Sequence, residues 1–313
     1  MKNFAYIIVV MFCLMGCKKN TVESPVAPAT GLYASTQFAA SEIKTYLNIP
    51  YATRPNYKGI QYTSETTKKE EKDKPLLTMK LDVGVPPNAV PGKLQPLIMY
   101  IHGGGFENGT KELFWDNCMA YAKAGYAVAT INYRLTPDNQ ANPTIRLMAI
   151  THATEDAMNA IRFLKKNAAT YFIDTNRIVT IGSSAGGGIS LINAVAFDEL
   201  TGAVSDYSGF SAKVAGAIST GATLLDATIP GSGSLLHFTS TDSPVLLYHA
   251  NPTDSFTGAT WNNNVIPTQN AINNSGNTCK TVAQPDMTHT VNLTLGGPNW
   301  DTVKQFLWTK LKL

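Results

Sequence analysis

Two short stretches of the sequence combine glycines with side chains that can do chemistry. The first, Gly182-Ser183-Ser184-Ala185-Gly186, lies between the apolar run 177–182, which predicts a buried strand, and the stretch 185–196, which predicts a helix. A serine on such a sharp strand-to-helix turn has its hydroxyl exposed above the sheet, and the flanking glycines let strand and helix approach closely. The pattern therefore predicts a nucleophilic serine at 184, beside the free N–H groups that begin a helix.

The second stretch is His102-Gly103-Gly104-Gly105-Phe106, which directly follows the wholly apolar run 97–101. Consecutive glycines let the backbone come close to a ligand and direct N–H groups at it. Both motifs follow predicted buried strands, so a parallel sheet would bring them to one edge. Together they predict a nucleophile beside donors that can stabilise an oxyanion.

The elements that must position these motifs alternate between short apolar runs and amphipathic stretches. Strand–helix–strand alternation predicts an α/β fold with a mostly parallel sheet and helices on both faces. The stretch 251–277 is rich in Asn, Thr and Gly, and we expect a long surface loop there. Strands are expected at 76–85, 97–101, 126–132, 177–182, 214–219, 244–249 and 281–283, and helices at 112–124, 152–169, 185–196 and 302–311.

Composition excludes several other classes of protein. The chain has 313 residues, and the 44% that are hydrophobic exclude a disordered chain. Net charge is +3, and the lysines at 68–74 alternate with acidic residues, so the run indicates a solvated face and not a nucleic-acid surface. Four cysteines are too few for a disulfide framework. Cys118 and Cys279 are expected to be small buried side chains, with a disulfide between them as the alternative.

The N-terminus has the pattern of an export signal. Lys2 precedes the apolar run 4–15, which is too short to span a bilayer but suits a secretory signal. The run ends in Leu14-Met15-Gly16-Cys17, which resembles the lipobox of bacterial lipoproteins and implies cleavage before Cys17 and its lipidation. We therefore expect a signal peptide at 1–16, a tether at 17–40 and a catalytic domain at 41–313, lipid-anchored in a bacterial cell envelope, on the periplasmic face or the cell surface. A cleaved signal with an incidental cysteine, or a short tail anchor, is the alternative.

With both glycine motifs in place, residues 75–313 resemble the α/β-hydrolase family, in particular its HGGG-type carboxylesterases and their hormone-sensitive-lipase-like branch. Ser183 stands where the best-known branches carry an acidic residue, which leaves the subfamily and its substrate open. Further matching segments are Leu81-Asp82-Val83, Tyr133-Arg134-Leu135-Thr136-Pro137-Asp138, the helix with Asp156, and Asp174-Thr175-Asn176-Arg177-Ile178.

The resemblance implies a role for each site residue. Ser184 is the nucleophile, and the backbone N–H groups of Ala185, Gly103 and Gly104 form the oxyanion hole. Chain order in this fold is serine, acid, histidine. His289, the only histidine after His249, is then the base. Asp254, shortly after the strand that ends at His249, is the expected acid, with Asp286 and Asp226 as alternatives.

Other polar residues have simpler expected roles. His102 and His249 are expected to form structural hydrogen bonds, and Asp156 and Asp174 to pack or cap. His152 and His237 receive no role. Phe106 is expected either to line the acyl pocket or to belong to the core.

The predicted function is hydrolysis of short-chain, acetyl-like esters by a serine carboxylesterase, with a small-molecule or carbohydrate ester as substrate. Few residues separate the strands at 214–219 and 244–249, so little or no lid is expected. This scheme needs no metal and no organic cofactor. A peptidase or amidase on the same fold, and a non-catalytic surface binding module, are the alternatives.

Overall fold

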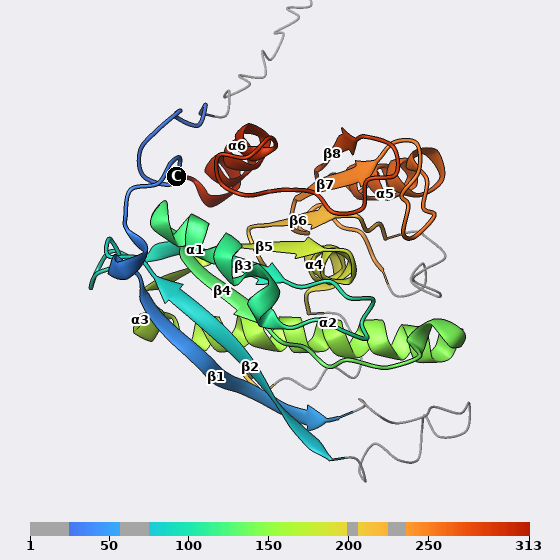
Figure 1. Cartoon of the computed structure of the whole chain (residues 1–313), viewed down its shortest axis with the longest axis horizontal. Helices are drawn as coiled ribbons and strands as arrows, with labels where there is room; N and C mark the ends of the chain where they lie inside the picture. The colour runs from blue at the N-terminus through green and yellow to red at the C-terminus, as the bar shows by residue number, and fades with distance from the viewer. Residues whose placement is uncertain (1–24, 57–74, 199–205, 225–235) are drawn as a thin grey trace, which may run out of the picture.

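A computed structural model of the chain describes residues 25–56, 75–198, 206–224 and 236–313, which form one eight-stranded sheet with helices on both sides (Figure 1). The order across the sheet is β1-β2-β4-β3-β5-β6-β7-β8. Pairing is antiparallel from β1 to β2 and from β2 to β4, and parallel everywhere else. The strands are β1 (Lys44–Pro55), β2 (Leu76–Val85), β3 (Gln95–Ile101), β4 (Ala127–Ile131), β5 (Ile173–Ser183), β6 (Gly216–Thr220), β7 (Val245–Ala250) and β8 (Cys279–Gln284).

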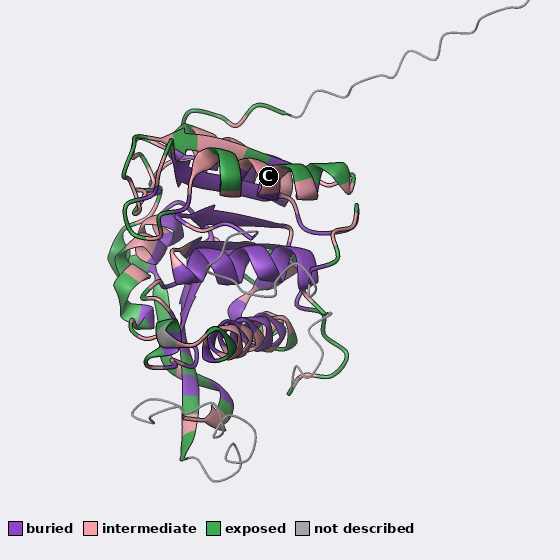
Figure 2. Cartoon of the chain, turned by 90° about the vertical axis from the view of Figure 1, so that its right-hand side faces the viewer, coloured by how far each residue is buried: buried purple, intermediate pink, exposed green. Residues whose placement is uncertain are grey.

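The helices cover the sheet in two layers, and each layer has its own apolar cluster. On one face α1 and α6 pack through Tyr121 and Leu307, and on the other α2 and α4 pack through Ile161 and Ile189. Figure 2 shows the central strands and α4 coloured as buried. The helices are α1 (Trp115–Lys123), α2 (Pro143–Lys166), α3 (Ala168–Tyr171), α4 (Ala185–Ala196), α5 (Ile266–Asn274) and α6 (Trp300–Leu311), with 3-10 turns η1 (Ala40–Glu42), η3 (Lys111–Phe114) and η4 (Asn139–Ala141) and a π-helical turn, η6 (Trp261–Val265).

Burial explains why the central strands are apolar at successive positions. Every residue of β3, β4, β6 and β7 is buried, as expected for strands that helices cover on both faces. The strands predicted from apolar runs are confirmed, with shifts of a few residues at their ends. Helix α4 has the predicted bounds, so the Ser184 turn is where the sequence indicated.

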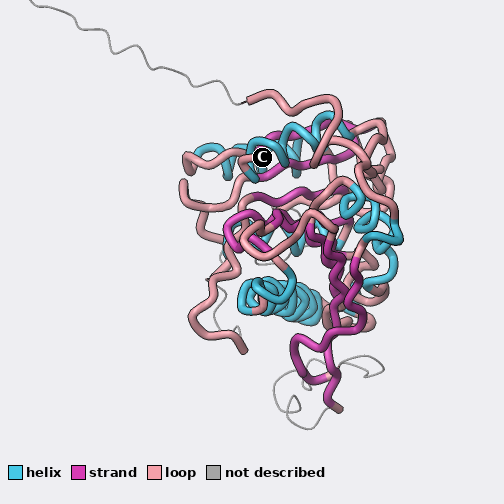
Figure 3. The backbone as a smooth tube through the Cα atoms, turned by 90° about the vertical axis from the view of Figure 1, so that its left-hand side faces the viewer, coloured by secondary structure: helices cyan, strands magenta, loops and turns pink. Residues whose placement is uncertain are grey.

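Three elements differ from the prediction. Strand β1 was not expected, and it forms with β2 a long antiparallel ribbon that extends from the sheet (Figures 1 and 3). Helix α2 begins at Pro143, well before the predicted start at residue 152, because Asn142 caps it by accepting the N–H of Thr144 at 2.8 Å. The predicted loop at 251–277 was wrong in part, since η6 and α5 lie within it and bury Val265 and Ile272.

The packed region also begins before the predicted boundary at residue 41. The Tyr33 N–H donates to the Ala124 carbonyl at 2.7 Å, and Trp300 Nε1 donates to the Ala34 carbonyl at 3.0 Å. Residues 31–40 are therefore part of the domain and not of a tether. The predicted signal peptide and Cys17 lie outside the described residues. Among the residues that are described, no helix has the length and apolarity to cross a membrane.

Cys118 and Cys279 are both buried free thiols, so the prediction of two small buried side chains is confirmed and the alternative disulfide is wrong. Burial raises the pKa of both thiols, which keeps them protonated.

Candidate active site

Ser184 occupies the turn between β5 and α4 with φ 53° and ψ −122°, a conformation that costs energy for any residue with a side chain. Neighbouring backbone holds it there. The Ser184 N–H donates to the Thr220 carbonyl at 2.8 Å, and the Ser184 carbonyl accepts the Gly188 N–H at 3.0 Å. The serine is thus fixed between the end of β6 and the first turn of α4, and its side chain borders an open cavity.

The glycines of this turn are required by close backbone contacts. A β-carbon on Gly182 would lie 1.9 Å from the Gly186 carbonyl oxygen, and one on Gly186 would lie 2.1 Å from the Ile101 carbonyl oxygen. No side chain fits at such distances. The first turn of α4 therefore lies directly against the ends of β5 and β3.

The glycine turn after β3 lies beside Ser184. A β-carbon on Gly103 would lie 3.0 Å from the Ser184 Cβ. Gly104, Gly105 and Phe106 all have positive φ, at 114°, 64° and 64°. Since Gly104, Ser184 and Ala185 line the same cavity, the turn and the start of α4 bring backbone N–H groups to the serine.

Two residues that the sequence analysis missed hold this turn. The Gly105 carbonyl accepts hydrogen bonds from Asn139 Nδ2 and from Arg146 Nη1, both at 2.9 Å. Arg146 also donates to Asn139 Oδ1 at 2.6 Å, and its guanidinium lies 4.8 Å from the centre of the Phe106 ring. Asn139 is fully buried. The Asn-Pro cap signal at 142–143 could have revealed the early start of α2 that carries Arg146, but no local pattern identifies Asn139.

Asp254 and His289 are in contact. His289 Nδ1 lies 2.8 Å from Asp254 Oδ2 and 3.0 Å from Oδ1. The carboxylate is buried, and it also accepts the N–H groups of Phe256 at 2.9 Å and Thr257 at 2.8 Å. Burial by itself would raise the pKa of Asp254, but the Thr257 N–H and the His289 imidazole outweigh it and lower that pKa. The group is therefore an ionised acceptor that makes His289 carry its proton on Nδ1 and leaves Nε2 free to accept one.

His289 lies beside the backbone that holds the serine. A β-carbon on Gly221, the residue after Thr220, would lie 3.0 Å from His289 Nδ1. The ring of Phe256 stacks on the imidazole with centroids 4.9 Å apart. Gly221, Phe256 and Ser184 line one cavity, so the structure brings serine, histidine and aspartate to the same edge of the sheet.

The alternative acid Asp286 does not take this position. Asp286 is exposed, and its carboxylate accepts the N–H groups of Thr253 at 3.2 Å and Met287 at 3.0 Å, which ties the acid loop to the histidine loop. Asp226 lies outside the described residues.

The cavity at this edge has a volume of about 470 Å³. Its wall combines glycine and alanine residues with polar and aromatic side chains. The lining comprises Gly104, Gly105, Phe106, Glu107, Asn108, Gln140, Arg146, Ser184, Ala185, Gly188, Gly221, Ala222, Thr223, Phe256 and Thr257. Phe106 belongs to the core and also lines this cavity.

His102 braces the glycine turn from behind. It is fully buried, stacks on Tyr133 with centroids 4.2 Å apart, and donates from Nδ1 to the Gly103 carbonyl at 2.7 Å. Burial lowers the pKa of His102 to about 4, so the ring is neutral at pH 7. His249 is also buried, with Nδ1 3.1 Å from the Ala250 carbonyl. Both have the structural hydrogen bonds that were expected.

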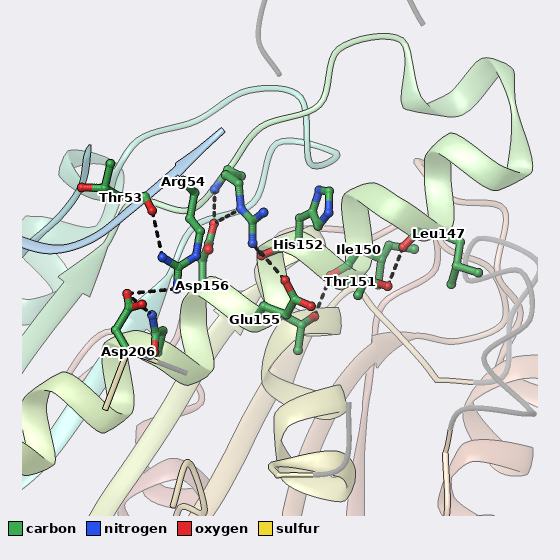
Figure 4. Close-up of polar contacts among 12 residues, drawn as sticks. Thr53, Arg54, Leu147, Ile150, Thr151, His152, Glu155, Asp156 and Asp206 are labelled. Carbon is green, nitrogen blue, oxygen red and sulfur yellow. Dashed lines mark hydrogen bonds and ion pairs between the residues drawn. The ribbon is translucent and has the colours of Figure 1, made fainter. Parts of the chain in front are cut away.

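Asp156 belongs to a buried ion pair, not to the reaction centre. Asp156 Oδ2 accepts from Arg134 Nε at 2.9 Å and from the Arg134 N–H at 2.8 Å, while Arg134 Nη2 also donates to Glu155. Figure 4 shows Glu155 and Asp156 on α2, near the ion pair of Arg54 with Asp206. Asp174 pairs with Arg177 at 2.7 Å and caps its own turn. Packing and capping were the expected roles of both aspartates.

The described residues contain no group of three or more His, Cys, Asp or Glu side chains arranged to hold a metal ion.

Comparison with known proteins gives the same fold. The thermophilic esterase of the planctomycete Thermogutta terrifontis superposes with a TM-score of 0.57 at 21% identity, covering 74% of this chain and 85% of that one. The chain has an α/β-hydrolase fold. The BD-FAE family model matches residues 81–225, the segment that carries the glycine turn and Ser184.

Curated relatives match about a third of this chain. Ethyl acetate hydrolase of Pseudomonas putida is 33% identical over 110 residues, which cover 35% of this chain and 32% of that enzyme. Carboxylesterase NlhH of Mycobacterium tuberculosis is 33% identical over 100 residues, 32% of this chain and 28% of that one. Neuroligin-2 of Homo sapiens, which is not named as an enzyme, is 35% identical over 31% of this chain and 11% of its own length. The matched segment therefore spans about a third or less of each relative.

Proposed function

We propose that this chain is a serine carboxylesterase with Ser184 as nucleophile, His289 as general base and Asp254 as the acid that orients it. The contact of Asp254 with His289 Nδ1, beside the cavity that Ser184 lines, is the observation that carries the proposal. The similarity to ethyl acetate hydrolase and carboxylesterase NlhH supports ester hydrolysis as the reaction.

The reaction follows from this arrangement. Ser184 Oγ attacks the ester carbonyl while His289 Nε2 takes its proton, and Asp254 stabilises the imidazolium that forms. The N–H groups of Gly103, Gly104 and Ala185 stabilise the oxyanion, each by about 2–4 kcal/mol. His289 then protonates the leaving alcohol. Water attacks the acyl-serine by the same route and releases the acid.

The acyl group is proposed to be short. Ala185, Gly188 and Phe106 line the cavity together with Ser184, and the volume of about 470 Å³ must hold both parts of the ester. We expect kcat/KM for p-nitrophenyl esters to fall steadily from acetate to dodecanoate. A rise along this series would contradict the short-acyl proposal and leave the esterase proposal intact.

The esterase proposal is tested with wild type and Ser184→Ala on acetate esters, a peptide nitroanilide and a fluorophosphonate probe. We expect ester turnover and an adduct at Ser184 in wild type, and neither in the variant. Ser183→Ala is the matched control, since the adjacent hydroxyl has no proposed role, and it should still form the adduct. Faster turnover of the nitroanilide would favour a peptidase or amidase, and no adduct in folded wild type would favour a binding module.

We also propose that Cys17 carries a lipid anchor, because it ends the lipobox-like run Leu14-Met15-Gly16-Cys17. Several acyl chains on this cysteine would give lasting membrane attachment. Cys17→Ala should move the protein from the membrane fraction to the soluble fraction. Cys13→Ala, in the apolar run of the same signal, is the control and should leave fractionation as in wild type. Unchanged fractionation of Cys17→Ala would contradict the anchor.

A further inference from the structure

Phe256 is an exposed aromatic side chain at the mouth of the cavity. It is 74% exposed, whereas most large apolar side chains of the described residues are buried. One face of its ring stacks on His289, with centroids 4.9 Å apart and 24° between the planes. Its ring also lines the cavity with Ser184. A large apolar surface is therefore open beside the reacting groups.

The ring is held in place by the loop that carries the acid. The Phe256 N–H donates to Asp254 Oδ1 at 2.9 Å, and the next N–H, from Thr257, donates to the same oxygen at 2.8 Å. Met287, from the histidine loop, is 55% exposed, and its N–H donates to the Thr253 carbonyl at 2.8 Å. Two loops tied to each other thus present apolar side chains on the histidine side of the site.

The histidine side is the side of the leaving alcohol. His289 must deliver its proton to the alcohol oxygen as the acyl-serine forms, so that oxygen lies next to the imidazole. The esterase proposal places the acyl group on the other side of Ser184, where Phe106 and Gly188 line the cavity. A group attached to the alcohol oxygen would therefore meet Phe256 first.

We propose that Phe256 is a specificity-determining residue that stacks on a six-membered ring carried by the leaving alcohol. The inference rests on the proposed esterase function. An aromatic ring and the apolar face of a sugar ring share the flat surface that such stacking needs. The polar neighbour Thr257 lines the same cavity. Its hydroxyl donates to Asp254 Oδ1 at 3.0 Å and accepts the Ala259 N–H at 3.2 Å, so its second lone pair is left to accept a hydrogen bond from a sugar hydroxyl. A purely shielding role for Phe256 over His289 would instead affect every substrate alike.

The test compares three acetates, so that the acyl group is constant: ethyl acetate without a ring, benzyl acetate with an aromatic ring, and an acetylated methyl xylopyranoside with a sugar ring. The quantity measured is kcat/KM for each ring ester divided by kcat/KM for ethyl acetate. Phe256→Leu keeps apolar volume but removes the flat ring, Phe256→Trp keeps a flat ring, and Phe256→Ala serves as a second removal. Phe210→Ala is the matched control, because Phe210 is exposed on the segment that enters the opposite end of β6.

We expect Phe256→Leu to lower this ratio at least five-fold for one or both ring esters. The loss should come from a higher KM for the ring ester. The ester that responds identifies the kind of ring that Phe256 stacks on. Phe256→Trp and Phe210→Ala should stay within two-fold of wild type. A fall of less than five-fold for both ring esters, or equal losses on all three acetates, would overturn the inference. Wild-type protein that hydrolyses none of the acetates would instead overturn the esterase proposal beneath it.

Discussion

Both carboxylate oxygens of Asp254 lie within 3.0 Å of His289 Nδ1, although the two residues are 35 positions apart in the chain. The carboxylate is also held by backbone N–H groups of its own turn, so it cannot rotate away without losing several hydrogen bonds. The histidine loop is fixed to the same turn through Asp286 and Thr253. The base and its orienting acid are thus one preformed unit.

Replacing this acid tests the unit directly. Asp254→Asn should lower kcat by roughly 10³–10⁴-fold, because an amide that donates to Nδ1 favours the wrong tautomer of His289. Initial rates on p-nitrophenyl acetate measure the effect. Asp286→Asn is the matched control and should reduce kcat by less than ten-fold. Equal losses in the two variants would contradict the assignment of Asp254.

Two glycines in the first turn of α4, Gly186 and Gly188, differ in how closely neighbouring atoms approach them. Gly186→Ala should prevent folding or cost several kcal/mol of unfolding free energy, since its β-carbon would lie 2.1 Å from the Ile101 carbonyl oxygen. Gly188→Ala should be neutral or stabilise by up to about 1 kcal/mol. Its β-carbon would lie 3.9 Å from Phe106 Cζ, an ordinary van der Waals distance, and alanine favours the helix. Urea unfolding of both variants provides the comparison, and similar unfolding energies would contradict it.

These glycines show why much of the site could be predicted from the sequence. The Ser184 turn and the glycine turn are local patterns, each formed within five residues and each directly after a buried apolar strand. Asp254 and His289 needed the chain order of a known family, because nothing in their own neighbourhoods specifies that they meet. Their contact depends on β7 and β8 lying side by side.

Two elements were not predicted from the sequence: β1, which is held by its pairing with β2, and α5, whose residues are mostly polar. Strand β1 carries two prolines and buries only two of its twelve residues, so it lacks the apolar alternation by which strands are recognised. Helix α5 consists largely of polar residues and buries only two side chains. Tertiary contacts with β2 and β8 stabilise these elements, and a local pattern does not record such contacts.

Asn139 offers a test of how the glycine turn is held. Asn139→Ala removes one of the two donors to the Gly105 carbonyl and should lower kcat about ten-fold with little change in KM, since a displaced oxyanion donor acts mainly on the transition state. The control is Asn193→Ala, which removes another buried amide, one that donates to the Ala212 carbonyl away from the cavity. Both variants should lose stability. A fall in kcat of the same size in Asn193→Ala would contradict a positioning role for Asn139.

His102 should make stability depend on pH in a defined window. Its pKa is about 4 in the folded protein and about 6.5 in an unfolded chain, so the unfolded state binds a proton first as the pH falls. The stability due to the neutral ring is complete above pH 6.5 and is lost as the pH falls from 6.5 to 4, by about 3 kcal/mol.

His102→Asn should be less stable at pH 7 but should lose about 3 kcal/mol less than wild type over this window, as measured by urea unfolding. His237→Asn, at an exposed histidine, should follow the wild-type curve. If His102→Asn and wild type lose equal stability, the buried ring is not the source of the acid sensitivity, and other groups that titrate between pH 4 and 6.5 must account for it.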